Sequence, residues 1–321
     1  MLPLVSFVIP VKNDASRLSR CLASVTGNDY PRELIEILVV DNESSDGSGQ
    51  AAIERGARVL RSSANSVAEL RNSGANQTHG AILAFVDADH EIDRQWVRAA
   101  VDVLSADDIG ATGAPCLTDP SPNWVQRQYD AMRGRLVSRE DVEWLGSGNL
   151  AVKKRVFNDI GGFDANLTAC EDVDLCNRVR QAGHRIVADP AMRNVHFGDP
   201  RTLKALFYGE LWRGRDNVRV TFRGPWTFRH LRSALIPIFD LIAIAIGVVA
   251  LLLGYPGVAA VCGLFVLGLI ALRAVMILRH QSRPGWSSAL EALAVAAVFD
   301  VAKALALLAR GSHRARRSDS A

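Results

Sequence analysis

Short apolar runs alternate with amphipathic stretches over the first 200 residues. Runs rich in β-branched and aromatic residues predict buried strands over residues 4–10, 34–40, 57–60, 81–86 and 109–114. Apolar positions at helical spacing predict helices over residues 16–25, 46–55, 66–77, 92–104 and 171–181. Strands and helices in this alternation predict an α/β fold with a largely parallel sheet covered on both faces. Ligands bind such sheets beyond the carboxyl ends of the strands.

The pattern changes near residue 234, where long apolar runs begin. Residues 234–255 are apolar except for Asp240, and residues 257–278 are apolar except for Arg273. Each run has about the 20 residues that a helix needs to cross a bilayer. The turn Tyr255-Pro256-Gly257 joins them, and we expect two membrane spans.

Charges beside these runs predict their orientation. Residues 201–232 hold eight Lys and Arg residues against two acids, with Trp226 and Phe228 interleaved. Such a basic and aromatic stretch predicts a cytoplasmic segment that lies at the membrane interface. Basic residues flank both spans on the same side, namely Arg229, Arg232, Arg279 and Arg283. We therefore expect both ends of the helix pair in the cytoplasm.

A third apolar run, residues 288–308, contains Glu291, Asp300 and Lys303. If it spans the membrane, the basic tail at residues 310–321 lies outside, against the positive-inside tendency. If it lies in the interface or re-enters, the tail stays inside. We favour a third span, because the run is long and Asp300 can neutralise Lys303 one helical turn away.

These boundaries predict four parts: residues 1–200, the interface segment 201–232, the membrane part 233–309 and the tail 310–321. A chain of 321 residues with 22% charged residues is neither disordered nor a disulfide scaffold. The net charge of +3 is too small to indicate nucleic-acid binding.

The five cysteines are scattered and none has the spacing of a zinc site, so we expect reduced thiols. The N-terminus lacks a basic region and contains Pro3 and Pro10, which favours a strand over a cleavable signal. We therefore expect the soluble part in the cytoplasm.

Asp87 and Asp89 directly follow the apolar run at residues 81–86. Alternation in an extended segment puts both carboxylates on one side of the chain. Paired carboxylates of this kind suit Mg²⁺ or Mn²⁺ that also binds substrate phosphates. The alternative is a solvated acidic turn.

Acidic residues also stand at two other element ends. Asp41 ends the strand at residues 34–40 and can accept a hydrogen bond from a nucleotide base, whereas Asp46 or Ser45 suits a helix cap. Three acids open the helix at residues 171–181, which is more than helix capping requires. One of them can serve as a general base toward a hydroxyl group.

Seven motifs stand in one order: VSFVIPVKND, VVDNESSDGS, AELRNSGA, AFVDADHE, GSGNLAVKK, GGFD and EDVDLCNRVRQAG. With these motifs, residues 3–215 resemble a family 2 glycosyltransferase of the membrane-anchored bacterial type. The resemblance implies the GT-A fold, a mainly parallel sheet flanked by helices, here followed by C-terminal transmembrane helices.

The resemblance also implies roles for individual residues. The nucleotide and donor would be bound by Pro10, Val11, Lys12, Asp41, Arg71, Asn72 and Asp87. The metal would be bound by Asp89, Asp87 and His196, although His196 can equally be an ordinary strand-end histidine. Asp172 would be the catalytic base. The acceptor side and active-site loop would contain Gly148, Asn149, Glu171, Trp212 and Arg213.

Two departures qualify the resemblance. Lys12 stands where members of the family usually have an aromatic residue. The Q-x-x-R-W motif of processive members is absent, and Trp212 and Arg213 lie in that region instead. Long processive synthesis is therefore not expected.

The implied reaction is inverting transfer of a sugar from a UDP- or GDP-sugar, with Mn²⁺ or Mg²⁺ as cofactor. The membrane runs point to a lipid-linked glycan or lipid acceptor, in cell-envelope or exopolysaccharide synthesis. We expect a multi-pass protein of the inner membrane with a cytoplasmic catalytic domain. The alternatives are a polyprenyl-phosphate monosaccharide transferase and a non-catalytic membrane-tethered scaffold. A nucleotidyltransferase would need a glycine-rich loop that VKNDASRL lacks.

Overall fold

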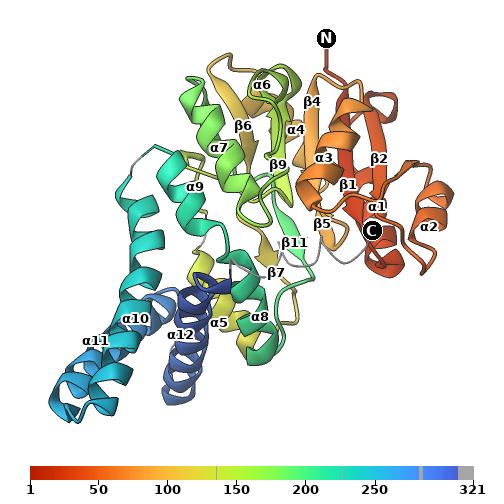
Figure 1. The fold of residues 1–321 in the computed structure, drawn as a ribbon. Coiled ribbons are helices and arrows are strands. Elements are labelled where there is room, and N and C mark those ends of the chain that lie inside the picture. The colour runs from red at the N-terminus through yellow and green to blue at the C-terminus, as the bar shows by residue number, and fades with distance from the viewer. Residues whose placement is uncertain (135, 226, 282–284, 310–321) are drawn as a thin grey trace, which may run out of the picture. The chain divides into compact units, whose positions relative to one another are not determined.

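The computed structural model describes residues 1–134, 136–225, 227–281 and 285–309. Contacts divide the chain into two compact units (Figure 1). The first comprises Met1–Pro120 and Arg135–Asp199, and the second comprises Ser121–Gly134 and the described chain after Asp199. The expected domain of residues 1–200 thus contains a segment, residues 121–134, that packs in the second unit.

The first unit is built on an eight-stranded sheet in the order β3-β2-β1-β4-β9-β6-β10-β8. Its strands are β1 (Val5–Val11), β2 (Ile35–Asp41), β3 (Arg58–Arg61), β4 (Ile82–Val86), β6 (Ile109–Gly113), β8 (Glu140–Asp141), β9 (Asn149–Lys153) and β10 (Arg185–Ala188). The sheet is mainly parallel, but β9 runs antiparallel between β4 and β6. All residues of β1 are buried, as expected for a strand covered on both faces.

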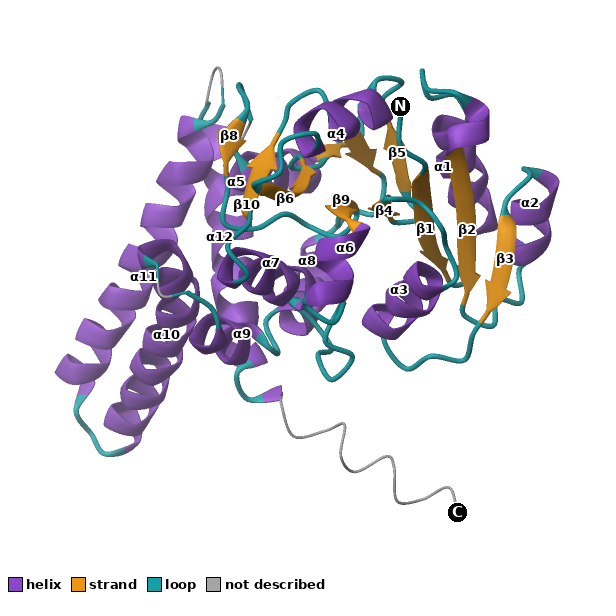
Figure 2. Cartoon of the chain, turned by 90° about the horizontal axis from the view of Figure 1, so that it is seen from above, coloured by secondary structure: helices purple, strands orange, loops and turns teal. Residues whose placement is uncertain are grey.

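Helices cover the two faces of this sheet (Figure 2). They are α1 (Ala15–Thr26), α2 (Ser48–Glu54), α3 (Val67–Asn76), α4 (Trp96–Leu104), α6 (Lys154–Asp159) and α7 (Glu171–Gln181). The short 3₁₀ helix η1 (Arg32–Leu34) leads into β2. Phe7 of β1 packs in one core with α1 and α4, whereas the next residue, Val8, packs in a second core with α3 and α7. This alternation follows from the two-residue repeat of side chains along a strand.

A second, three-stranded sheet corrects one sequence prediction. The helix expected over residues 92–104 begins only at Trp96, because Ile92 ends the short strand β5 (His90–Ile92). β5 pairs with β11 (Asn194–His196), which also pairs with β7 (Leu117–Thr118). The partner of β5 lies about a hundred residues away in sequence, so local periodicity does not reveal the strand.

The second unit is helical. It contains α5 (Trp124–Arg133), α8 (Leu203–Arg213), α9 (Asn217–Arg223), α10 (Phe228–Leu252), α11 (Pro256–Arg279) and α12 (Trp286–Ala306). Side chains of α5, α8, α11 and α12 form its apolar core, including Val125, Leu206, Ile277 and Val295. A capping box between Asn123 and Gln126 starts α5.

Two helices of the described chain are long and apolar enough to cross a membrane. They are Leu231–Leu252 within α10 and Pro256–Arg279, which is α11, with mean hydropathies of 2.7 and 2.6. Most of their residues are exposed in the isolated chain, unlike those of a soluble core helix. The run expected as a third span forms α12, which packs against α8, α10 and α11.

Pro237 lies inside α10 without ending it. Proline has no N–H to donate to the carbonyl four residues earlier, that of Ser233. The Nδ2 atom of Asn217 in α9 donates to that carbonyl oxygen at 2.8 Å. The side chain thus supplies the hydrogen bond that the helix has lost.

The expected pairing of Asp300 with Lys303 is wrong. Asp300 of α12 binds Arg273 of α11 at 2.7 Å, and Lys303 binds Glu210 of α8 at 3.1 Å. Because α12 lies among other helices, each charge has a partner on a neighbouring element. The basic tail at residues 310–321, Trp226, Arg283 and the side chain of Arg229 lie outside what the structure describes.

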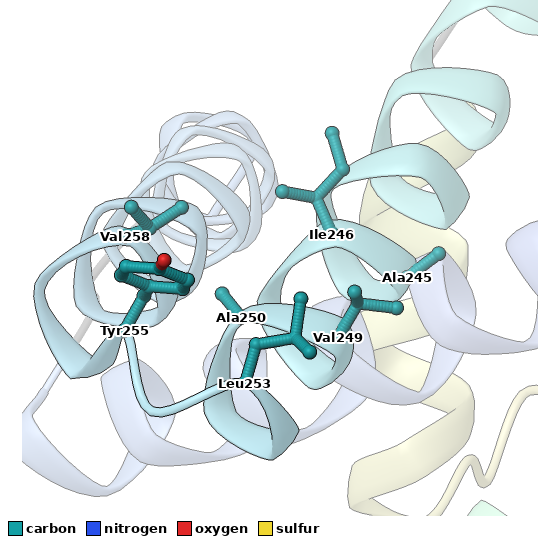
Figure 3. Close-up of a pocket in the computed structure, with 7 residues that line it drawn as sticks. All are labelled: Ala245, Ile246, Val249, Ala250, Leu253, Tyr255 and Val258. Atoms are coloured by element: carbon teal, nitrogen blue, oxygen red, sulfur yellow. The ribbon is translucent and has the colours of Figure 1, made fainter.

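An apolar pocket lies where α10 meets α11 (Figure 3). It is lined by Ala245, Ile246, Val249, Ala250, Leu253, Tyr255 and Val258. The lining contains no charged side chain, so this pocket suits hydrocarbon rather than a phosphate or a sugar.

Candidate active site

The strand order β2-β1-β4 brings three predicted site segments to one edge of the sheet. Val11 at the end of β1 pairs with Asp41 at the end of β2, and Asp87 directly follows β4. Asp41 is buried, and its Oδ1 accepts a hydrogen bond from the Ser44 backbone N–H at 3.0 Å. Pro10 is buried, whereas Lys12 is exposed just beyond the strand.

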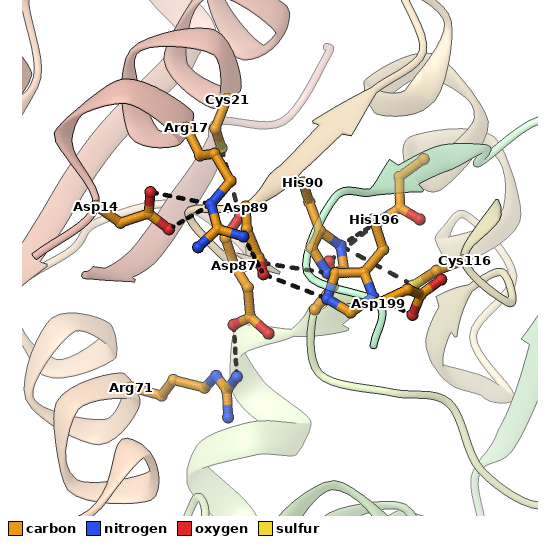
Figure 4. Close-up of polar contacts among 12 residues, drawn as sticks. Asp14, Arg17, Cys21, Arg71, Asp87, Asp89, His90, Cys116, His196 and Asp199 are labelled. Carbon is orange, nitrogen blue, oxygen red and sulfur yellow. Dashed lines mark hydrogen bonds and ion pairs between the residues drawn. The ribbon is translucent and has the colours of Figure 1, made fainter. Parts of the chain in front are cut away.

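Arg71 of α3 connects this edge to α7. Its side chain is 3% exposed, and one guanidinium nitrogen lies 2.6 Å from Asp87 Oδ1 while another lies 2.8 Å from Glu171 Oε1 (Figure 4 shows the contact with Asp87). Burial acts to lower the pKa of Arg71, but the charges of Asp87 and Glu171 raise it above its ordinary value. A permanently charged side chain therefore holds the two carboxylates.

Asp172 follows Glu171 in the first turn of α7 and is half-buried. Burial raises the pKa of Asp172 to about 7, with a further increase from the negative charge of Glu171, and Arg71 only partly opposes this. Its Oδ2 lies 3.8 Å from the position that a Cβ on Gly146 would take, so it faces the turn before β9. A carboxylate that ionises near neutral pH is suited to general-base chemistry.

Asp89, His90 and His196 form a cluster suited to a divalent metal ion. Their potential ligand atoms all lie within 4.8 Å of one another. The cluster forms because β5 and β11 pair with His90 opposite His196. Asp89 Oδ2 lies 3.3 Å from His196 Nε2, and Asp89 Oδ1 lies 3.6 Å from His90 Nε2. Carboxylate oxygen and imidazole nitrogen are both ligands of first-row divalent ions.

Gly198 leaves the space that such an ion needs. A Cβ at this position would lie 2.7 Å from His196 Nε2 and would collide with Asp89 Oδ2. The donor atoms and the absence of a side chain at residue 198 together fit a divalent ion beside Asp89.

The charges of the cluster are balanced internally. Burial acts to raise the pKa of Asp89, but hydrogen bonding and charge from His196 lower it to about 2. Burial acts to lower the pKa of His196, but Asp199 and Asp89 raise it to about 9. Asp87 Oδ1 lies 2.6 Å from Arg71, and its expected part as a second ligand stays a prediction.

Three comparisons place these motifs among known proteins. The model of the family described as Glycosyl transferase family 2 matches residues 6–162. Glycosyltransferase AglE of Haloferax volcanii is 31% identical over 196 residues, which are 58% of this chain and 64% of that protein. This chain is therefore similar to family 2 glycosyltransferases over residues 6–162. It spans less than two thirds of AglE's length.

Solved structures share the fold of this chain. A mannosyltransferase from Pyrobaculum calidifontis, PcManGT, in complex with GDP-Man and Mn²⁺, aligns over 94% of this chain and 88% of that one, with a TM-score of 0.60 and 18% identity. GalNAc-T7 with UDP, GalNAc and Mn²⁺ aligns over 74% of this chain and 51% of that one, with a TM-score of 0.54 and 19% identity. The GT-A fold expected from the sequence is confirmed.

Two expected site residues have their amide groups occupied by other parts of the protein. Asn72 donates to the Phe163 carbonyl at 2.8 Å and accepts from the Phe163 N–H at 2.9 Å, which fixes the GGFD turn. Asn149 is fully buried, accepts from Trp96 Nε1 at 2.6 Å and donates to two backbone carbonyls. Gly148, by contrast, lies at the site, since a Cβ there would come within 2.9 Å of Asp87 Oδ2.

Trp212 and Arg213 belong to the second unit of the chain, on α8. Trp212 is 44% exposed, and Arg213 binds Glu210 at 2.7 Å. Their expected part in the acceptor side stays a prediction.

The sequence prediction missed His90, Asp199 and Arg17. Arg17 of α1 lies 3.9 Å from Asp89, and Asp199 lies 2.9 Å from His196. Two of these residues carried a local signal, because His90 directly follows Asp89 and Asp199 stands three positions after His196.

Proposed function

We propose that this glycosyltransferase moves a sugar from a nucleotide-diphosphate sugar to a hydroxyl group of a membrane-associated acceptor, with inversion at the anomeric carbon. The observation that carries the proposal is the Arg71 bridge between Asp87 and Glu171. Through it, the strand edge expected to hold the donor and the helix turn that bears Asp172 form one connected network. The GDP-Man and UDP in the titles of the two structural neighbours support a UDP- or GDP-sugar donor.

The donor would lie along the edge formed by β2, β1 and β4. Asp41 at the end of β2 would accept a hydrogen bond from the nucleotide base, and Val11 would line the base. Lys12 is exposed just past β1 and offers a positive charge to the diphosphate. Asp87 would contact the donor while its Oδ1 accepts a hydrogen bond from Arg71.

Asp89 and His196 would hold Mn²⁺ or Mg²⁺, and the Mn²⁺ in both neighbouring structures supports a divalent ion. When bound, the ion would neutralise the negative charge that grows on the diphosphate leaving group.

Asp172 would accept the proton of the acceptor hydroxyl as that oxygen attacks the anomeric carbon. Glu171 would not compete for this proton, because Arg71 holds its Oε1 at 2.8 Å and Ser147 donates to the same atom at 3.4 Å. The pKa of Asp172, raised to about 7 by burial and by Glu171, gives it the basicity for this role.

The acceptor would be a lipid or a lipid-linked glycan. α10 and α11 are long and apolar enough to span a membrane, which would keep the enzyme where such acceptors lie. The pocket between these helices is lined by apolar side chains and suits a hydrocarbon chain. Basic residues at 201–232 favour a cytoplasmic catalytic domain near anionic headgroups.

Replacement of the proposed base tests the function. Asp172→Asn should keep donor affinity, measured by calorimetry with Mn²⁺, and lower the transfer rate about 10²- to 10⁴-fold. Asp174→Asn is the matched control, because Asp174 lies on the same helix but pairs with Arg178 at 2.7 Å. We expect this control to keep its transfer rate.

Normal transfer by Asp172→Asn would remove Asp172 from the role of base. If that transfer went to a polyprenyl phosphate, it would favour the alternative of a phosphate acceptor, whose oxygen is already ionised and needs no base.

A further inference from the structure

The two histidines beside Asp89 differ in the hydrogen-bond partner of their Nδ1 atoms, which is an acceptor for His196 and a donor for His90. Asp199 Oδ1 lies 2.9 Å from His196 Nδ1, and the Asp199 side chain is 1% exposed (Figure 4). A carboxylate accepts, so Nδ1 of His196 must donate to it. The neutral form of His196, the form that can bind a metal ion, therefore carries its hydrogen on Nδ1 and has a lone pair on Nε2. In the protonated form, the same Nε2 donates to Asp89 Oδ2 at 3.3 Å.

In His90, by contrast, Nδ1 accepts a hydrogen bond from a neighbouring side chain. The Nδ2 atom of Asn194 lies 2.7 Å from His90 Nδ1 and 3.1 Å from the Gly148 carbonyl oxygen. That carbonyl can only accept, so the amide of Asn194 presents its NH₂ group to both partners. Nδ1 of His90 is then an acceptor, and a neutral His90 carries its hydrogen on Nε2, which faces Asp89 Oδ1 at 3.6 Å.

We propose that Asp199 is a positioning residue that fixes His196 in the tautomer whose Nε2 binds the divalent ion beside Asp89. Asn194 fixes His90 in the opposite tautomer, whose Nε2 bears a hydrogen and is excluded as a ligand. The inference rests on the proposed function, which supplies the ion.

The spacing of the donor atoms agrees with this assignment. Adjacent ligands of an octahedral ion with bonds of about 2.1 Å are separated by about 3 Å. The 3.3 Å between Asp89 Oδ2 and His196 Nε2 is close to that value. Gly198 keeps the space beside these same two atoms free of a side chain. A carboxylate behind a ligating histidine also increases the basicity of the ligand nitrogen.

The test uses the full chain in detergent micelles and Mn²⁺ alone. The electron paramagnetic resonance signal of free Mn²⁺ gives the affinity, and spin-echo modulation from ¹⁴N reports a coordinated histidine. Asp199→Asn preserves the side-chain volume and Asp199→Ala removes the group, and we expect each to weaken Mn²⁺ binding about 10- to 100-fold.

Asp189→Asn is the matched control for loss of a buried carboxylate. Asp189 is 4% exposed in the same unit and binds Arg139 and the Ala191 N–H, but has no contact with either histidine among the described interactions. We expect its Mn²⁺ affinity to equal that of the unchanged chain.

The identity of the ligand is tested separately. We expect His196→Ala to abolish the ¹⁴N modulation and His90→Ala to retain it. The opposite pattern, or wild-type affinity in both Asp199 variants, would overturn the inference while leaving a metal-dependent transferase intact. No Mn²⁺ binding by the unchanged chain would overturn the inference together with the metal-dependent function.

Discussion

Several side chains near the candidate active site act through what they hold in place. Arg71 is buried and binds two carboxylates, so it fixes their geometry. Gly148 acts through the absence of a side chain, because a Cβ there would come within 2.9 Å of Asp87 Oδ2. Single residues thus shape the site either by binding a neighbouring side chain, as Arg71 does, or by leaving room for one, as Gly148 does.

The raised pKa of Asp172 predicts the pH dependence of transfer. Burial and Glu171 raise this pKa to about 7, and the base must be ionised, so kcat should rise about tenfold per pH unit below 7 and level off above it. The measurement is kcat at saturating donor between about pH 5.5 and 8.5. A kcat that is constant over this range would contradict the assignment.

The raised pKa of Asp172 also predicts how this residue affects the stability of the folded state. The folded state raises the pKa of Asp172, so ionisation opposes folding above the unfolded pKa of about 4. At pH values above about 7, Asp172→Asn should therefore not lower the unfolding temperature, and a lower transfer rate in this variant would reflect chemistry.

At the scale of elements, charged contacts join helices of the second unit. Arg273 of α11 binds Asp300 of α12 at 2.7 Å, and both oxygens of Asp240 in α10 are buried without a hydrogen-bond partner among the described residues. The charge of Arg273 acts on both acids in a largely apolar bundle. Its removal would leave Asp300 without its ion-pair partner.

Arg273→Leu should lower the free energy of unfolding by about 3–5 kcal/mol, because it breaks a buried pair and leaves one charge unpaired. Thermal unfolding in detergent micelles gives the measurement. The double variant Arg273→Leu with Asp300→Asn should recover part of the loss. An unchanged unfolding temperature for Arg273→Leu would show that this pair does not hold α11 against α12.

The sequence predicted most elements that form from their own periodicity. It missed six short strands, of two to five residues, because their partners lie far away in sequence: β5, β7, β8, β9, β10 and β11. It also assigned no helix to α5 or α6. The same limit applies to the site. Asp41 and Asp87 end apolar strands and were predictable, whereas Asp199 acquires its role only when β11 pairs with β5 and brings His196 to Asp89.

At the scale of the whole molecule, the α/β unit that holds the candidate active site is covalently joined to two helices long and apolar enough to cross a membrane. Under the proposed function, such a link would restrict the enzyme to acceptors near a bilayer surface. It would also raise the local concentration of acceptors that carry their own lipid.

This arrangement predicts a preference among acceptors. In vesicles, transfer to a lipid-linked glycan should exceed transfer to the same glycan without its lipid. Radiolabelled donor and separation of the two products would give the ratio. Equal rates at equal concentration would contradict a membrane-bound acceptor.

The path of the chain between the two units has a practical consequence. The polypeptide leaves the catalytic unit at residue 120, contributes α5 to the helical unit and then returns. A single cut near residue 200 would therefore separate α5 from α8, α11 and α12, and would uncover Val125, which is 1% exposed in the intact chain. Excising a water-soluble enzyme from this protein thus requires redesign of an internal loop as well as a shortened C-terminus.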